Sequence, residues 1–281
     1  MNGERIPIAV IGGGTMAQAI VRGGFDAGVI APSAVVVADP EGPKRELFRT
    51  WGVRAVKDAG EAAAWLVQAE SPAGAGQVLL AVKPQSFAEV AAALGPGLGP
   101  ARRVVVSLMA GVPTAKVRAA LGDQAAVVRL MPNLPARVGK STTAVALGAG
   151  AQEGDDRFAV ELFTAIGRTV PVAEPLMDAF TAVAGSGPAY LFYLAEAMTK
   201  AAVGVGFDRD TAQWIVRSTL AGAAALMDGT DQSPELLRAA VTSKGGTTAA
   251  AVAVLDEAEV IGAFVRAIAS ARDRGRELAG G

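Results

Sequence analysis

A short polar and glycine-rich run near the end of the chain offers groups that bind a small anion. It reads Thr242-Ser243-Lys244-Gly245-Gly246-Thr247-Thr248 and leads directly into a helix rich in alanine and valine. Thr247 or Thr248 is expected to be the N-cap of that helix, and the two glycines leave the backbone bare just before it. Unpaired N–H groups and the positive helix end then converge on one spot, which suits a carboxylate or phosphate. The alternative is a plain helix–helix turn, and from this run alone the turn is the preferred interpretation.

A second candidate anion site lies near the start of the chain. Residues 6–11 are apolar and are followed by Gly12-Gly13-Gly14-Thr15-Met16-Ala17 and then by a helical pattern. The spacing of Gly12, Gly14 and Ala17 fits the dinucleotide-binding pattern G-x-G-x-x-G/A, placed between a strand and a helix as that pattern requires. Gly12 permits the tight turn, Gly14 lets a pyrophosphate approach the backbone, and Ala17 lets the helix pack closely against the sheet.

An acidic residue follows at the distance that this pattern predicts. The next predicted strand, residues 34–38, ends in Asp39, which lies 25 residues after Gly14. An acid roughly 20 residues after the glycines binds the adenosine ribose in dinucleotide-binding folds. The alternative is that Asp39 only caps the turn at Pro40, and the context favours the ribose role. Two anion-binding stretches, one near each end of the chain, favour a ligand for both.

Three further loops follow predicted strands, at residues 81–84, 107–111 and 131–135. We expect them to line one crevice, because ligands of parallel sheets gather at the carboxyl ends of the strands. Lys83 is either a solvated surface lysine or a contact to ribose or phosphate. Asn133, held between two prolines, is either a turn residue or a rigid amide donor toward nicotinamide or substrate.

The composition excludes several classes of chemistry. The 281 residues include no cysteine and no histidine, which removes disulfides, thiolate nucleophiles, histidine-containing triads and nearly all zinc sites. Catalysis must then rest on a cofactor, hydroxyls, lysine, carboxylates or backbone dipoles, and no metal is expected. A net charge of −1, no basic cluster and 5% aromatic residues do not indicate nucleic-acid binding. Apolar stretches end before the ~20 residues that a bilayer requires, so we expect no membrane span and a cytoplasmic location.

Strand and helix patterns alternate through the first part of the chain. Strands are predicted at 6–11, 34–38, 54–56, 77–82, 102–108, 127–131, 142–147 and 169–172. This alternation indicates a Rossmann-type α/β domain with a mostly parallel sheet covered on both faces. Residues 72–76 and 95–100, rich in glycine and proline, are expected to be surface loops.

From residue 173 onward the pattern becomes all-helical, so the predicted domains are 1–172 and 173–281. Pro188 is well suited to open a helix at about 189–205, and another is predicted at about 208–227. Both are apolar most of the way round, which predicts burial that about a hundred residues hardly provide alone. We therefore expect a homodimer through these helices. The alternative is a compact monomeric bundle.

With these features the sequence resembles the pyrroline-5-carboxylate reductase family over most of its length. The similarity is carried by GGGTMA at 12–17, AVKP at 81–84, AGV at 110–112, MPNLP at 131–135, GSGPAY at 185–190 and SKGGTT at 243–248. The last two together are specific, whereas the first is shared by all dinucleotide enzymes. The resemblance implies NAD(P)H-dependent reduction of the cyclic imine 1-pyrroline-5-carboxylate to L-proline, the last step of proline biosynthesis. It also implies an intertwined homodimer through the C-terminal helices, often assembled further into a decamer.

The resemblance assigns roles to individual residues. Ser243, Gly245, Gly246, Thr247 and Thr248 would grip the substrate carboxylate, and Thr248 is the candidate hydrogen-bond partner of the ring nitrogen. That nitrogen can arrive protonated, so a site without histidine or metal suffices if it aligns the imine carbon on the nicotinamide. The candidate cofactor-binding residues are Ile11, Gly12, Gly13, Gly14, Thr15, Met16, Ala17, Asp39, Ala81, Val82, Lys83, Pro84, Ala110, Gly111 and Asn133.

Three positions depart from the family's pattern. Lys244 replaces a common proline and Leu134 a common threonine, which leaves local contacts open. Asp39 stands where many members carry a serine that accommodates a 2′-phosphate. Its carboxylate would bind the free 2′-hydroxyl of NADH and repel the phosphate of NADPH. Lys44 and Arg45 argue the other way, so the predicted cofactor is NADH or NADPH, with Asp39 favouring NADH.

Two other functions stay open at this point. A β-hydroxyacid dehydrogenase also joins a Rossmann half to a helical half, but it uses a catalytic lysine in a G-x-x-x-K setting. Lys200 is the only lysine in that region, and the glycine of the setting is missing. A non-catalytic NAD(P)-binding scaffold or regulator is the other alternative, and it would bind the cofactor without turning over a cyclic imine.

Overall fold

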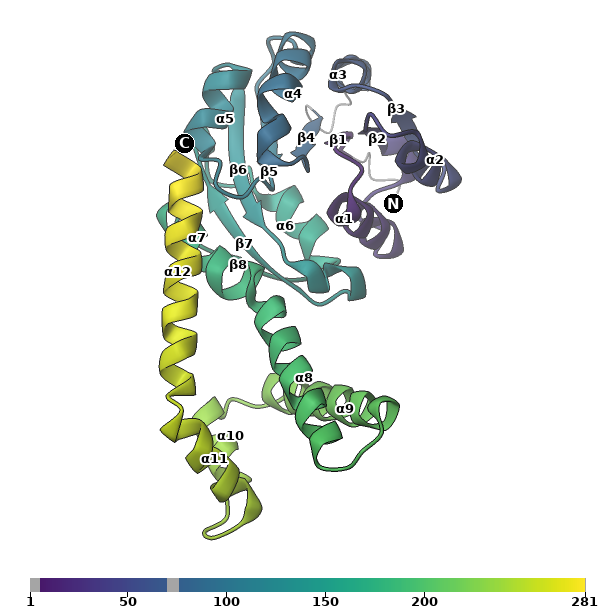
Figure 1. Ribbon diagram of the computed structural model, residues 1–281. Coiled ribbons are helices and arrows are strands. Elements are labelled where there is room, and N and C mark those ends of the chain that lie inside the picture. Colours follow the sequence, from purple (N-terminus) through teal and green to yellow (C-terminus); the bar gives the residue numbers. More distant parts are fainter. Residues whose placement is uncertain (1–5, 70–75, 281) are drawn as a thin grey trace. The chain divides into compact units, whose positions relative to one another are not determined.

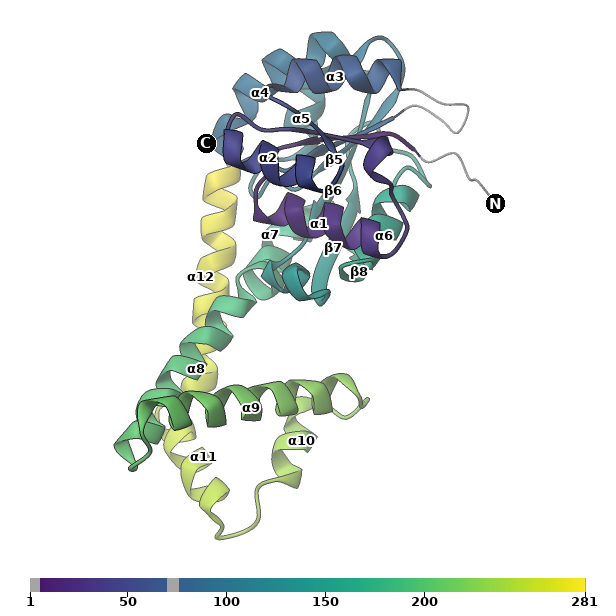
Figure 2. The same ribbon diagram turned by 90° about the vertical axis from the view of Figure 1, so that its right-hand side faces the viewer.

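The computed structural model describes residues 6–69 and 76–280, and the chain divides into two compact units (Figure 1 and Figure 2). The first unit runs to Gly185 and includes the chain from Ala271 onward, and the second unit is Ser186–Ser270. This division differs from the predicted boundary after residue 172. Residues 173–185 fold with the first unit because Met177 is fully buried in a cluster with Met131 and other residues of the sheet.

The first unit is built on one eight-stranded sheet with the order β3-β2-β1-β4-β5-β6-β7-β8. All neighbouring strands are parallel except β6 and β7, which confirms the predicted Rossmann-type, mostly parallel sheet. Every predicted strand is present, with ends shifted by at most two residues. The strands are β1 (Ile8–Ile11), β2 (Val35–Ala38), β3 (Arg54–Val56), β4 (Gln77–Leu80), β5 (Arg103–Ser107), β6 (Ala125–Met131), β7 (Ser141–Leu147) and β8 (Gly167–Pro171).

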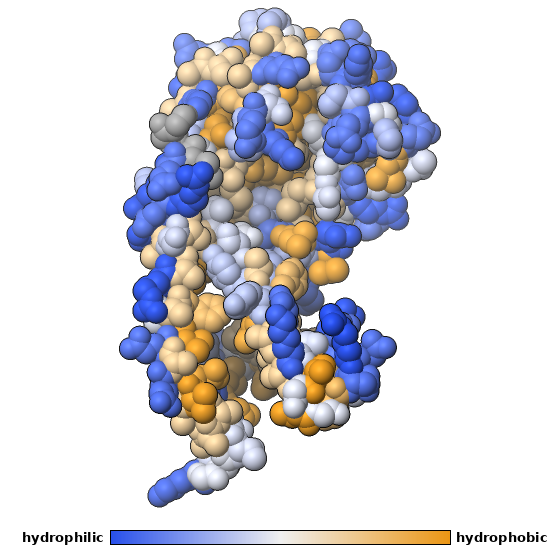
Figure 3. Space-filling view, viewed as in Figure 1, coloured by the Kyte–Doolittle hydropathy of each residue, from blue (hydrophilic) through white to orange (hydrophobic). Residues whose placement is uncertain are grey.

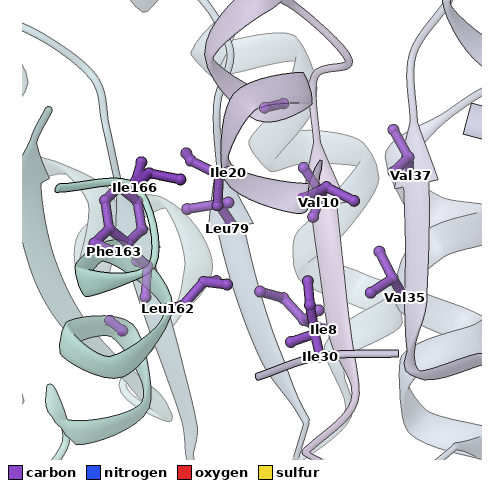
Figure 4. Close-up of a cluster of buried hydrophobic side chains, with 14 of the residues drawn as sticks. Ile8, Val10, Ile20, Ile30, Val35, Val37, Leu79, Leu162, Phe163 and Ile166 are labelled. Atoms are coloured by element: carbon purple, nitrogen blue, oxygen red, sulfur yellow. The ribbon is translucent and has the colours of Figure 1, made fainter. Parts of the chain in front are cut away.

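Helices cover both faces of this sheet, because alternate residues of a strand point to opposite sides. Ile8 and Val10 of β1 belong to one buried cluster, which α1 and α6 complete (Figure 4). Ala9 and Ile11 belong to a second cluster on the other face, completed by α3, α4 and α5. The helices of this unit are α1 (Thr15–Asp26), α2 (Gly42–Thr50), α3 (Ala59–Gln68), α4 (Phe87–Leu94), α5 (Thr114–Leu121), α6 (Arg157–Thr164) and α7 (Met177–Phe180).

The two predicted surface loops have different outcomes. Residues 72–75 lie outside the described part of the chain. Gly95–Leu98 forms a short 3-10 helix instead of an open loop, and Leu98 is fully buried. The reason is that this leucine joins the second hydrophobic cluster, so the segment is held to the sheet by its one large apolar side chain.

The second unit is all-helical, as predicted. Pro188 stands in the first turn of α8, and the Asp208 carboxylate caps α9 by accepting the Thr211 N–H at 2.9 Å. Among the described residues of this unit, Ala212 and Val216 are its buried apolar side chains. Large apolar side chains gather on its surface instead (Figure 3). Its helices are α8 (Gly187–Gly204), α9 (Arg209–Asp228), α10 (Pro234–Ala240), α11 (Thr247–Glu257) and α12 (Val260–Gly280) as far as Ser270.

An ion pair between Arg102 and Asp155 makes a pH-dependent contribution to the stability of the first unit. The Arg102 guanidinium donates to both oxygens of Asp155, at 2.9 and 2.5 Å, and these bonds hold the pKa of that carboxyl below its usual range. A lowered pKa in the folded state adds stability above the unfolded-state pKa of about 3.9. That stability is lost as the pH falls through the folded-state pKa.

We expect Asp155→Asn to lower the free energy of unfolding by about 0.5–1 kcal/mol at pH 7 and pH 5, because the pair is partly exposed. The difference in unfolding free energy between wild type and variant should become smaller as the pH falls from 5 toward 3. Urea unfolding at each pH would measure it. Asp123→Asn is the control, since Asp123 is fully exposed beside Arg118 and its loss should be undetectable. A difference in unfolding free energy at pH 3 as large as that at pH 7 would contradict the assignment of this stability to the ion pair.

Candidate functional site

The carboxyl ends of β1, β2 and β4 are joined at one edge of the sheet by backbone hydrogen bonds. The Gly12 N–H donates to the Ala38 carbonyl, and the Ala81 N–H donates to the Ile11 carbonyl, each at 2.8 Å. Gly12 has φ 101°, and a side chain there would meet the Ala81 carbonyl oxygen at 2.6 Å. Only glycine satisfies both conditions, so the tight turn predicted at this position is a requirement of the fold.

The glycine turn continues into α1 as the sequence predicts. Gly14 is the N-cap residue, with extended backbone, and Thr15 begins the helix. A side chain at Gly14 would meet nothing within 4 Å, so its backbone faces open space. Ala17 is fully buried between helix and sheet, while Thr15 is exposed and Met16 half-buried. The first N–H groups of α1 have no acceptor within the helix and point out of this open end.

Asp39 lies directly against the glycine turn. Its Oδ2 accepts the Gly13 N–H at 2.8 Å, its Oδ1 accepts the Glu41 N–H at 2.9 Å, and the side chain is buried. The carboxylate therefore caps the turn at Pro40, which is the alternative role that the sequence left open for Asp39. It also joins the turn after β2 to the turn after β1. Each oxygen has a second lone pair, so these bonds leave acceptor capacity for a ligand hydroxyl.

The structure places the two basic residues at the start of α2, Lys44 and Arg45, near Asp39 but gives them different partners. Lys44 Nζ lies 3.7 Å from Asp39 Oδ2 and 2.5 Å from Glu41 Oε1. The hydrogen bond to Glu41 raises the pKa of Lys44, so the ammonium stays charged. Arg45 instead donates to the Asp39 and Pro40 carbonyls, at 2.8 and 2.7 Å, and holds the loop. Lys44, not Arg45, is thus the cation placed beside the Asp39 carboxylate.

The other strand-end loops lie where the parallel sheet requires. Lys83 and Pro84, after β4, are exposed, and no ion pair of Lys83 is found among the described residues. Ala110, after β5, is also exposed, and Gly111 beside it has φ 69°. Val82 is half-buried against Gly12. These positions are compatible with the predicted cofactor contacts, which stay a prediction.

Asn133 is buried, and its amide already holds protein groups. Its Oδ1 accepts the Thr142 N–H at 3.0 Å, and its Nδ2 donates to the Ala184 carbonyl at 2.9 Å. The amide therefore ties the loop after β6 to β7 and to the π-helical turn Thr181–Gly185. One Nδ2 hydrogen is left by this arrangement for a nicotinamide or a substrate.

Four residues that sequence reasoning missed form a polar cluster near these loops, in which Thr114 and Arg129 are buried and Glu174 and Asp178 are partly exposed. Glu174 accepts two hydrogen bonds from Thr114, one from its N–H and one from its hydroxyl, each at 2.7 Å. Arg129 lies between the carboxylates of Glu174 and Asp178, at 4.0 and 3.5 Å. The signal in the sequence was Arg129 itself, because a charged residue inside a fully apolar strand needs partners.

The run predicted to bind the substrate carboxylate, residues 243–248, lies in the second unit, and its N-cap differs from the prediction. Gly246, not Thr247 or Thr248, is the N-cap residue of α11, and neither threonine hydroxyl caps the helix. The reason is a tight turn in which the Gly246 N–H donates to the Ser243 carbonyl at 3.0 Å. A side chain at residue 246 would meet Ser243 Oγ at 2.5 Å, and Gly245 has φ 71°. Both threonines therefore stand in the first turn of the helix, where their hydroxyls are available for other bonds.

The rest of the described chain offers few other catalytic groups. Lys200, on α8, is exposed and is paired with Glu196 at 2.7 Å, which does not suit the catalytic lysine of a β-hydroxyacid dehydrogenase. The described residues contain no group of three or more carboxylates arranged to hold a metal ion. In the same part of the chain, no helix has both the length and the apolar character needed to cross a bilayer.

Known proteins match this chain along nearly its whole length. The family model for pyrroline-5-carboxylate reductase dimerisation matches residues 174–278, and that for NADP oxidoreductase, coenzyme F420-dependent, matches residues 7–111. A pyrroline-5-carboxylate reductase from Synechocystis is 38% identical over 97% of this chain and 98% of its own. One from Haemophilus influenzae is 38% identical over 96% of this chain and 97% of its own. The solved structure of a pyrroline-5-carboxylate reductase from Coxiella burnetii has a TM-score of 0.88 at 32% identity, covering 98% and 99% of the two chains.

The matches include both candidate anion sites. The glycine turn falls within the nucleotide-binding match, and residues 243–248 fall within the dimerisation match. The relatives are more than 30% identical over nearly their full length, so the similarity covers the whole candidate site. The chain therefore belongs to the pyrroline-5-carboxylate reductase family.

Proposed function

We propose that this chain reduces 1-pyrroline-5-carboxylate to L-proline with NAD(P)H, as the last step of proline biosynthesis in the cytoplasm. The observation that carries the proposal is the full-length similarity to pyrroline-5-carboxylate reductases. The direct test is to follow oxidation of NADH or NADPH with pyrroline-5-carboxylate and with its six-membered homologue. A protein that binds cofactor but turns over neither imine would be a regulator instead.

The first unit fits a nicotinamide dinucleotide. The open backbone at Gly14 and the amino end of α1 suit a pyrophosphate, and the Asp39 carboxylate lies beside that turn to accept a ribose hydroxyl. The same edge of the sheet continues toward the nicotinamide through Ala81–Pro84, Ala110, Gly111 and Asn133. When bound, the cofactor supplies the hydride.

The second unit supplies the groups that hold the imine. The N–H groups at the start of α11 and the bare backbone of Gly245 and Gly246 bind the carboxylate, assisted by the hydroxyls of Ser243 and Thr247. Thr248 accepts a hydrogen bond from the protonated ring nitrogen and orients the ring. Because that nitrogen arrives protonated, no residue here has to act as a strong acid, and alignment provides most of the rate.

We further propose that NADH is the preferred cofactor, since a buried carboxylate beside the ribose repels a 2′-phosphate. The value of kcat/KM should be higher with NADH than with NADPH. Asp39→Ser should shift the ratio of the two toward NADPH by about tenfold or more, because the repulsion disappears while Lys44 stays. Lys44→Ala should shift it the opposite way. A strong preference of the wild type for NADPH would defeat this proposal.

For Thr248, we expect Thr248→Ala to lower kcat about ten- to a hundredfold, because the ring nitrogen loses its partner. Binding of NADH, measured by titration, should be unchanged. Thr164→Ala is a suitable control, since it makes the same change on α6 in the first unit, where the Thr164 hydroxyl donates to the Val160 carbonyl. If Thr248→Ala lost only stability, with kcat intact in the folded fraction, Thr248 would have a structural role alone.

We also propose that the chain is a homodimer through the helices of the second unit, assembled further into a decamer. Support comes from the surface of this unit, where Phe192, Tyr193 and Trp214 are 61%, 75% and 70% exposed. Large apolar side chains exposed in this number are typical of a protein interface, and so few buried side chains hardly stabilise a unit alone.

The wild type should therefore run at least as a dimer in size-exclusion chromatography with light scattering. Trp214→Glu should shift it toward monomer and lower the melting temperature, because an unpaired carboxylate would be buried in the interface. Leu47→Glu, a similar change at an exposed apolar residue of α2, should leave the mass unchanged. A wild-type protein that is monomeric at micromolar concentration would contradict the proposal.

A further inference from the structure

We propose that Glu174 is a positioning residue for the dinucleotide, acting through the loop between β5 and α5. The inference rests on the proposed function, in which Ala110 and Gly111 of that loop contact the cofactor. Glu174 begins the short 3-10 helix Glu174–Leu176, between β8 and α7 (Figure 1). It lies outside every motif that relates this chain to a dinucleotide, yet its carboxylate reaches the end of the loop.

Glu174 caps α5 from a position 60 residues further along the chain. Its two carboxylate oxygens accept the N–H and the hydroxyl of Thr114, the first residue of the helix, each at 2.7 Å. Pro113, which precedes the helix, has no side chain that could cap it. A carboxylate here also interacts favourably with the positive end of the helix dipole. The end of the loop that enters α5 is thus held by Glu174.

The other end of the loop is held independently. The Leu108 N–H donates to the Leu80 carbonyl at 3.0 Å, and the Met109 N–H donates to Ser107 Oγ at 3.4 Å. Between the two ends, Ala110 is exposed and Gly111 adopts φ 69°. The position of Ala110 and Gly111 therefore depends on how the two ends of the loop are held. Loss of the Glu174 bonds would loosen the end at Thr114, whose hydroxyl would keep the hydrogen bond from the Ala149 N–H.

A buried guanidinium keeps Glu174 in place. Arg129 is 4% exposed, and its Nη1 and Nη2 lie 4.0 Å from Glu174 and 3.5 Å from Asp178. Its Nε and Nη2 have no hydrogen-bond partner in the described part of the chain. The charge of Arg129 is therefore compensated by the two carboxylates, and separating Glu174 from it would leave a poorly paired buried charge.

The same segment holds a second candidate cofactor loop. Ten residues after Glu174, the Ala184 carbonyl accepts a hydrogen bond from Asn133 Nδ2 at 2.9 Å. Ala184 belongs to the π-helical turn Thr181–Gly185, an element found frequently at functional sites. Residues 174–184 thus contact both the loop after β5 and the loop after β6, and Glu174 provides the charged contact.

The test compares Glu174→Gln with Asp155→Asn in the full-length protein. The amide of glutamine presents a donor where Thr114 needs an acceptor, whereas Asp155 pairs with Arg102 at the opposite end of β5. NADH binding is measured by fluorescence titration, and the kinetics with pyrroline-5-carboxylate. We expect Glu174→Gln to raise Kd and KM for NADH about tenfold, with kcat and KM for the imine within about twofold. Asp155→Asn should leave NADH binding unchanged.

Unchanged NADH binding by Glu174→Gln would overturn the proposal. An equal weakening in Asp155→Asn would also overturn it, because the effect would then follow stability alone. Thr114→Val removes the hydroxyl that donates to Glu174 and that also accepts the Ala149 N–H at 2.9 Å. Because the Thr114 N–H still donates to Glu174, this variant should raise Kd less than Glu174→Gln and in the same direction. Its NADH titration decides the matter if Glu174→Gln does not fold. If Glu174→Gln weakens NADH binding but even the wild type reduces no cyclic imine, the proposed function fails and the positioning role stands.

Discussion

The hydrogen bond from the Gly13 amide to the Asp39 carboxylate is the interaction on which the candidate cofactor site depends. It joins the turn after β1 to the turn after β2, while the Glu41 amide binds the second carboxylate oxygen. Gly12, one residue earlier, lets the backbone of Ala81 approach because it has no side chain. The amino end of α1 is thereby set in place by bonds within the protein, as preorganised binding of an anion requires.

The absence of histidine and cysteine gives the main chain an unusually large share of the chemistry. Both candidate anion sites consist of glycines followed by the first turn of a helix, α1 in one unit and α11 in the other. Glycine costs conformational entropy on folding, but it exposes N–H groups that no larger residue would leave accessible. Hydride transfer to a protonated imine suits such a site, because it needs alignment more than it needs a strong acid or base.

Two buried arginines show how the loops around the sheet are held. Arg103, at the amino end of β5, donates to the carbonyls of Leu98 and Gly76 and so joins two loops to the strand. Arg129, on the neighbouring strand β6, lies between the carboxylates of Glu174 and Asp178. Through Glu174, Arg129 connects the chain that leaves β8 to the loop that follows β5. The two carboxylates offset the cost of burying its charge.

The sequence by itself determined the features that depend on neighbours along the chain. Strand periodicity, the glycine turn at 12–17 and the helix after Gly246 are set by residue types within a few positions, so they were predicted nearly residue by residue. The fold class followed from the same patterns, because alternating strands and helices have few ways to pack. The candidate residues at the strand ends followed in turn from the rule for parallel sheets.

Only the tertiary structure decided how residues far apart in the sequence are paired. The partners of Asp39, the cap that Glu174 provides for α5 and the inclusion of residues 173–185 in the first unit all depend on such contacts. Even the N-cap at Gly246 was decided by the tight turn in which the Gly246 N–H donates to the Ser243 carbonyl, which residue preferences do not contain. Side-chain type and spacing describe what a residue can bond to, but its actual partner is chosen by the backbone geometry that brings the two together.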